Sequence, residues 1–176
     1  MSELRTNKIF PRDGLPSGAD GGGIIQVVSN TKTDTASVTG ATFGDVGLSV
    51  NITPTSSSNK ILILVQANIG ASVGYSMKTR LMRDSTAIHI GDSSSSRPQA
   101  TTEVTQTYGS NNNYNADQAN IVFLDSPATT SQVTYKIQMA SYSTYIVYIN
   151  RNGADLNTTG YDARTASSIT VMEISA

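Results

Sequence analysis

Apolar and polar residues alternate with a period of two along much of this chain. Alternation of this kind places apolar side chains on one face of an extended strand and polar side chains on the other. It is clearest over three stretches: 48–52, 75–83 and 133–139. In the last of these, Val133, Tyr135, Ile137 and Met139 share one face. The pattern therefore predicts half-buried strands, as in an antiparallel sheet with one wet face.

Turn-forming residues separate these strands from further apolar runs. Pro54 and the serines after it end one strand, and Asp84-Ser85-Thr86 predicts a turn into the next. Residues 93–118 are poor in apolar side chains, and we interpret them as a long surface excursion. The remaining strands are expected at 24–28, at an edge strand with a turn near Gly40, and at 60–70, 87–90, 121–124, 145–150 and 168–174. About eight to ten strands without a helical period favour an all-β, antiparallel β-sandwich or jelly roll.

Three stretches are apolar on both faces: the first half of 60–70, 121–124 and 145–149. An antiparallel sandwich normally exposes one face of each strand, so these stretches indicate an additional buried surface. We expect subunits to supply it, in a homotrimer. The alternative is burial under the loops of a single sandwich. The interface candidates are Ile121, Phe123, Tyr145, Val147 and Tyr148.

Composition supports the all-β prediction. Ile and Val number 27 against 8 Leu, and Ser and Thr number 45, a bias that suits pleated surfaces. With 12 basic and 13 acidic residues, the chain lacks the positive charge that nucleic acid requires, so no nucleic-acid partner is expected. No apolar run approaches the roughly 20 residues that span a bilayer, so no membrane partner is expected. Cysteine is absent, which excludes disulfides and thiolate metal sites.

The chain divides into an N-terminal arm, residues 1–23, and a domain, residues 24–176. The arm holds two of the five prolines and five of the fourteen glycines, and it is too polar to form its own core. Its apolar residues are suited to anchoring on a neighbouring subunit or a second protein, and folding back on its own domain is the alternative. They are Leu4, Ile9, Phe10 and Leu15.

The sequence contains few residues of the types that commonly act in catalysis. His89 is the only histidine, no nucleophile motif accompanies it, and we interpret it as an exposed strand residue. Asp92, Asp125 and Asp155 are interpreted as turn residues that accept backbone N–H bonds. We therefore predict a protein that is not an enzyme and has no catalytic residue, metal site or cofactor. A ligand loop is possible within 93–118, where Tyr108, Asn112 and Tyr114 have side chains suited to sugars.

The chain contains six notable motifs: GGGIIQVV, LSVNITPTSSSNKILILV, RDSTAIHIGD, IVFLDSPATTSQVTYKIQM, VYINRNGAD and SITVMEISA. Together they resemble small virion structural proteins of tailed bacteriophages, especially marine ones, described as tail-fibre or head-decoration proteins. The resemblance spans nearly the whole chain, and LRTNKIFPRDGLPSG is similar to the N-terminal arm of such proteins. The sandwich also resembles the trimeric jelly roll of C1q and tumour necrosis factor domains.

The resemblance implies a virion part made in the host cytoplasm, and two roles follow. The first is a trimeric head decoration or short capsid appendage, anchored by the arm to capsid or tail components. The second is a tail-fibre or receptor-binding tip whose loops bind a host-surface glycan or protein. The short arm, without a repetitive shaft, favours the first role.

Overall fold

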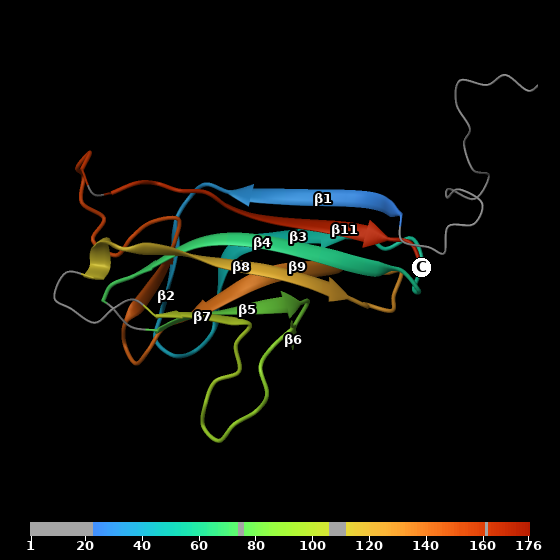
Figure 1. The fold of residues 1–176 in the computed structure, drawn as a ribbon, viewed down its shortest axis with the longest axis horizontal. Helices are drawn as coiled ribbons and strands as arrows, with labels where there is room; N and C mark the ends of the chain where they lie inside the picture. Colours follow the sequence, from blue (N-terminus) through green and yellow to red (C-terminus); the bar gives the residue numbers. More distant parts are fainter. Residues whose placement is uncertain (1–22, 74–75, 106–111, 161) are drawn as a thin grey trace, which may run out of the picture.

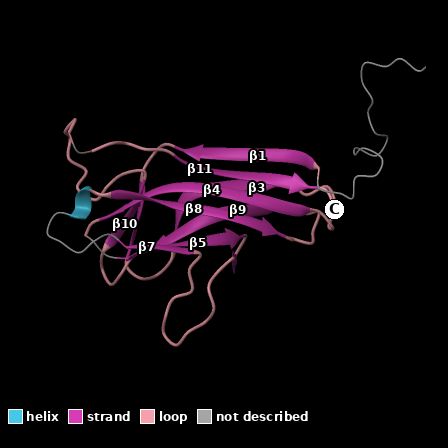
Figure 2. Cartoon of the chain, viewed as in Figure 1, coloured by secondary structure: helices cyan, strands magenta, loops and turns pink. Residues whose placement is uncertain are grey.

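The structure is a computed structural model, and it describes residues 23–73, 76–105, 112–160 and 162–176. These residues form strands joined by turns, with one short 3-10 helix, η1 (Asn112–Tyr114) (Figure 2). The strands are β1 (Ile24–Lys32), β2 (Ala36–Thr39), β3 (Gly44–Ile52), β4 (Lys60–Ala71), β5 (Ser76–Arg83), β6 (Thr86–Ile88), β7 (Thr102–Thr105), β8 (Ala116–Asp125), β9 (Val133–Ala140), β10 (Ile146–Ile149) and β11 (Ser167–Ile174).

Two antiparallel sheets pack against each other. Sheet A contains β1, β11, β4 and β8 side by side (Figure 1). The short strands β10 and β2 continue it past Ser167, the first residue of β11, because β10 pairs with β4 between Ile69 and Ala71. Sheet B has the order β3-β9-β5, with β6 and β7 both paired to β5. The first long strand thus lies beside the last one. Between them the chain passes from one sheet to the other several times: β3 lies in sheet B, β4 in sheet A, β5 to β7 in sheet B, β8 in sheet A and β9 in sheet B. The protein is an antiparallel β-sandwich of the jelly-roll type, as its sequence predicts.

The alternating pattern builds the core between the sheets. Val133, Tyr135, Ile137 and Met139 of β9 are all buried, which confirms the face predicted for that strand. Across the sandwich, β4 contributes Ile61, Ile63, Val65, Ala67 and Ile69 from alternate positions. A period of two places each of these sets on a single face, so one strand from each sheet is enough to define the middle of the core.

The prediction for residues 93–118 is wrong in part. They contain β7, which pairs with β5, and the 3-10 helix η1, and β8 already begins at Ala116. Strand β7 escaped prediction because it has only one apolar residue, Val104, which packs against the core. One apolar residue is enough for a short edge strand of this kind, since only one of its faces is buried.

The sandwich has two distinct ends. At one end, the Ser175 N–H donates to the carbonyl of Gly23 at 2.9 Å, so the start of β1 and the end of β11 lie together (Figure 1). The connection 150–166 and η1 lie at the opposite end (Figure 1). We call these the terminal end and the loop end. The predicted arm, 1–23, lies outside the described residues except for Gly23, and with it Leu4, Ile9, Phe10 and Leu15.

Candidate functional site

The outer face of sheet A changes from apolar to polar along its strands. Strand pairing aligns residues of β1, β11, β4 and β8 into rows that cross the sheet. The row nearer the terminal end is apolar throughout: Val27, Met172, Leu62 and Leu124. The next row is mixed: Ser29, Thr170, Leu64 and Val122. The row nearer the loop end is polar: Thr31, Ser168, Gln66 and Asn120.

The apolar part of this face is open to solvent in the single chain. Val122 is 68% exposed, Val27 56% and Leu124 44%, while Leu62, Leu64 and Met172 are half-buried. Ile24, 56% exposed, and its pairing partner Ile174 extend the surface to the terminal end. We call this surface the apolar half-face and define it as Ile24, Val27, Leu62, Leu64, Val122, Leu124, Met172 and Ile174.

The two-sided apolar stretches of the sequence are the cause of this surface. In β4 and β8 the inward positions, such as Ile63 and Ile121, are already buried in the core. Their neighbours Leu62, Leu64, Val122 and Leu124 therefore have to point outward, because successive side chains of a strand face opposite ways. For these two strands, the described chain leaves the second apolar face uncovered.

The third two-sided stretch is covered within the chain. Val147 and Ile149 face the core, and Tyr148 is only 8% exposed because the Arg151 guanidinium lies 3.6 Å from its ring centroid. Here the alternative of burial inside one sandwich is the correct interpretation. Beside it, Tyr145 is half-buried and stacks on Tyr142 with 6.3 Å between ring centroids.

The named interface residues therefore need correction, although the interface itself stays a prediction. Ile121 is 3% exposed and Val147 is fully buried, so neither offers surface to a second subunit. Phe123 faces inward as well and stacks on His89, with ring centroids 4.6 Å apart. The pairing register of β8 with β4 decides which face of β8 is inside, and it selects the odd-numbered residues from Ala119 to Asp125. The sequence alone does not show this choice.

A buried polar cluster joins the sheets at the terminal end of β8. Asp125, 5% exposed, accepts two hydrogen bonds from Arg83 Nη1 at 2.9 and 3.0 Å and one from the Tyr135 hydroxyl at 2.7 Å. Burial raises the pKa of Tyr135 far above its usual value, and the hydrogen bond to Asp125 raises it further, so the hydroxyl stays a donor. Asp125 therefore links the two sheets through these hydrogen bonds and is not the turn residue that we predicted.

Glu173 forms a second buried cluster at the same end. Its Oε1 accepts from the Thr55 N–H at 2.7 Å, the Thr55 hydroxyl at 2.8 Å and Asn59 Nδ2 at 2.7 Å. Burial acts to raise the pKa of Glu173, but the hydrogen bonds from Asn59 and Thr55 outweigh it and hold that pKa below its usual value. The carboxylate thereby fixes the turn between β3 and β4.

At the loop end, Asn150 joins several segments. It is fully buried with a φ of 64°, a left-handed conformation that asparagine tolerates better than most residues. Its Nδ2 donates to the carbonyls of Lys32 and Asp34 at 2.8 Å each, and its Oδ1 accepts from Ser167 at 2.6 Å. Sequence reasoning missed this residue, whose signal is an asparagine placed directly after a buried strand.

A polar pocket of about 360 Å³ lies in the connection after Asn150. It is lined by Asp155, Leu156, Asn157, Thr158, Asp162, Ala163 and Arg164. Asp155 pairs with Arg164 and with Arg151, and the hydrogen bond from Arg164 holds the pKa of Asp155 below its usual value. Asp155 has a positive φ of 50° in its turn, as a turn residue would, and its carboxylate pairs with two arginines.

Part of the predicted ligand loop contacts this connection. The carbonyl of Asn113 accepts from the N–H groups of Gly153 and Ala154 at 2.7 and 2.8 Å. Asn112 and Tyr114, which is 38% exposed, belong to the same short helix, η1. Tyr108 lies outside the described residues. The structure thus brings the described part of the ligand loop to the connection 150–166, while ligand binding there stays a prediction.

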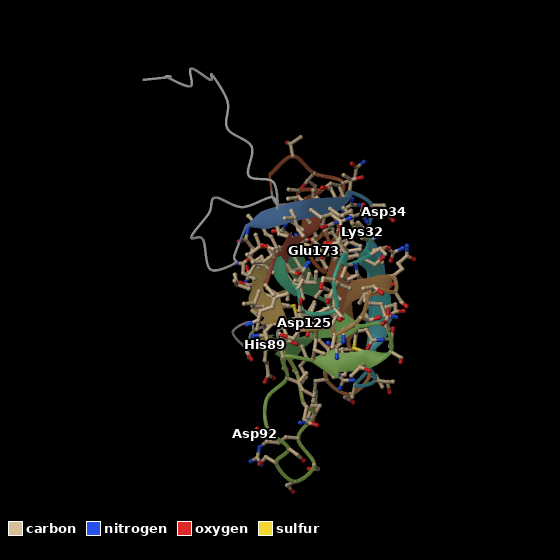
Figure 3. All side chains as sticks on the ribbon, turned by 90° about the vertical axis from the view of Figure 1, so that its right-hand side faces the viewer. Lys32, Asp34, His89, Asp92, Asp125 and Glu173 are labelled. Atoms are coloured by element: carbon tan, nitrogen blue, oxygen red, sulfur yellow. The ribbon has the colours of Figure 1, made fainter. Side chains whose placement is uncertain are left out.

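The remaining candidates for chemistry are dispersed. His89 is exposed, as predicted, but it follows β6 with a φ of 51° and is not a strand residue. Asp92 lies on a projecting loop, well apart from Lys32, Asp34 and Glu173 (Figure 3). Over the described ranges, no group of three or more His, Asp or Glu side chains is arranged to hold a metal ion. No helix in the same ranges is long and apolar enough to cross a membrane.

Fold and surface together define an antiparallel jelly-roll domain in which the described residues leave the apolar half-face of sheet A uncovered. No family model matches the chain, and no curated protein matches it. Among solved structures, it is similar to a chain in the structure of infectious bursal disease virus Gx strain, with a TM-score of 0.46 and 12% sequence identity. The match covers 94% of this chain and 45% of that chain. The assignment of the fold rests on the two sheets themselves and not on this likeness.

Proposed function

We propose that the chain is a non-enzymatic structural component of a bacteriophage virion, a trimeric head decoration or short capsid appendage anchored by its N-terminal arm. Capsid or tail proteins are its partners, and it is made in the host cytoplasm. The resemblance of its sequence motifs to small phage virion proteins supports this proposal. The rigid sandwich supports it as well, because an appendage has to keep its shape without chemistry.

The observation that carries the proposal is the separation of the two ends. The arm joins the domain at Gly23, whose carbonyl accepts a hydrogen bond from Ser175 at the terminal end. The connection 150–166 lies at the loop end (Figure 1). A domain tethered at one end presents the other outward. This arrangement suits a part that attaches through residues 1–23 and extends away from a particle surface.

A tail-fibre or receptor-binding tip is the second candidate. The pocket lined by Asp155, Asn157, Thr158 and Arg164 favours it, because this polar site lies in the connection at the end away from the tether. Carboxylate, amide, hydroxyl and guanidinium groups at one site are suited to the hydroxyl groups of a host-surface glycan.

Imaging of labelled particles tests both candidates. A gold-binding tag is added after Ala176 in a phage that encodes this chain, and the particles are imaged by electron microscopy. We expect label over the head. Label confined to the tail tip would favour the receptor-binding role, and purified particles without label would refute both.

The anchoring role of the arm has its own test in the full chain. The paired changes Ile9→Asp and Phe10→Asp are compared with Thr6→Asp and Asn7→Asp in the same segment. Both pairs add two negative charges, but only the first removes apolar side chains. We expect the first pair to abolish incorporation into particles and the second to retain it. Equal incorporation of the two variants would contradict apolar anchoring.

A further inference from the structure

The apolar half-face is large enough to form the apolar part of a subunit interface. Four of its side chains are 44–68% exposed and the other four are half-buried, which leaves an aliphatic patch on the order of several hundred Å², the size of the largest patch on an ordinary monomer. An interface of standard size buries about 800 Å² on each partner, of which somewhat more than half is apolar. The exposed surface of the apolar half-face is therefore comparable in size with the apolar part of such an interface.

The chemistry of this surface narrows the choice of partner. No charged side chain belongs to it, and Lys60, which pairs with Ile174, is at its rim. A partner consequently has to present an apolar surface, since an unpaired charge buried here would be costly. Of the eight large apolar side chains exposed in the described chain, four belong to the apolar half-face, and Ile25 lies beside it in the β1 bulge. The other three lie outside sheet A: Tyr114, Tyr142 and Leu156.

A second copy of this chain presents a surface of this kind, namely its own apolar half-face. It also borders a free sheet edge, because β8 pairs with β4 and with no other described strand. Between Gln118 and Leu124, β8 has no charge, proline or bulge of the kind that usually protects an edge. Two copies brought together here would cover both the apolar side chains and part of this edge.

We propose that further copies of this chain bind the apolar half-face, each presenting its own apolar half-face, around the axis of an oligomer. The polar half-face stays in water and is not part of the contact. It consists of Thr31, Gln66, Asn68, Gln118, Asn120 and Ser168. The proposal deepens the proposed function, on which it depends only for the number of copies, three.

The test compares two pairs of lysine substitutions on the outward face of β8. Val122→Lys and Leu124→Lys together place two charges in the apolar half-face, whereas Gln118→Lys and Asn120→Lys place the same charges in the polar half-face of β8. Multi-angle light scattering on the full chain gives the mass of each protein. We expect trimers for the unchanged chain and the control, and a rise of more than 100-fold in the concentration needed for association of the apolar-face variant.

The absence of cysteine allows a second measurement that does not weaken the interface. Single variants Val122→Cys and Gln118→Cys are labelled with a maleimide reagent in the native protein. Both side chains are exposed in the single chain, so equal rates are expected of a monomer. In the proposed oligomer, labelling at position 122 is at least tenfold slower than at position 118. This result also decides the question should the double lysine variant fail to fold.

The possible results distinguish a failure of the proposed contact between copies from a failure of the proposed virion role. A monomeric unchanged chain, or association that survives both lysine pairs equally, would overturn the proposed contact. A dimer that is lost only in the apolar-face variant would support the contact and remove the trimer from the proposed function. Label on the phage head would leave the proposed virion role intact in either case.

Discussion

Removal of the Tyr135 hydroxyl tests how much the hydrogen bonds at Asp125, which link the two sheets, contribute to stability. Tyr135→Phe deletes a single atom whose hydrogen bond to Asp125 Oδ2 is 2.7 Å long, in a side chain with no solvent exposure. The ring keeps its place in the core. Asp125 keeps its two bonds from Arg83 but loses one donor, while the residue itself is only 5% exposed.

The expected cost is about 2 kcal/mol, because a hydrogen bond to a charged group contributes about 1.5–3 kcal/mol when its partner is left buried. For a domain of this size, 1 kcal/mol corresponds to about 2–4 °C in the melting temperature, so we expect a loss of about 4–8 °C. Urea unfolding at pH 7 measures the free energy directly. All variants are compared at one protein concentration, since self-association would add to the apparent stability.

Tyr142→Phe is the matched control, because Tyr142 is 55% exposed. We expect it to change the free energy of unfolding by less than about 0.5 kcal/mol. The double-mutant cycle of Tyr135→Phe with Asp125→Ala then isolates the pair, and its coupling should equal most of the single loss. A Tyr135→Phe variant as stable as the unchanged chain would show that the cluster contributes no stability through this bond.

Two further predictions concern the ends of the sandwich. Because a Cβ at Gly153 would lie 1.9 Å from the carbonyl oxygen of Ala71, we expect Gly153→Ala to lower the free energy of unfolding by about 2–4 kcal/mol in urea titrations. Gly160→Ala, where no atom lies within 4 Å of the added Cβ, should cost less than about 0.5 kcal/mol, and equal losses would exclude the backbone clash. The folded pKa of Glu173 is lowered, so its stabilising effect is present above the unfolded pKa, about 4.3, and is lost as the pH falls through the folded pKa. The stability gap between the unchanged chain and Glu173→Gln should accordingly be largest at pH 7 and shrink toward pH 3, and a constant gap would refute the linkage.

The sequence by itself determined the fold class and most strands. Alternation in 48–52 and 133–139 is a local property, because a period of two places apolar side chains on one face whatever the neighbouring strand is. For the same reason, the two-sided stretches correctly indicated more apolar surface than one core face holds. Strand β7 was missed because its single apolar residue, Val104, gives no period to detect.

Only the tertiary structure decided which apolar faces are covered. Val122 and Ile121 are neighbours of similar chemistry, yet one is 68% exposed and the other 3%, because the register of β8 on β4 turns one outward and the other inward. Tyr148 is covered because the chain beyond β10 brings Arg151 over its ring. Register and long-range packing join residues far apart in the sequence, so a local pattern counts the apolar faces but does not assign what lies against each one.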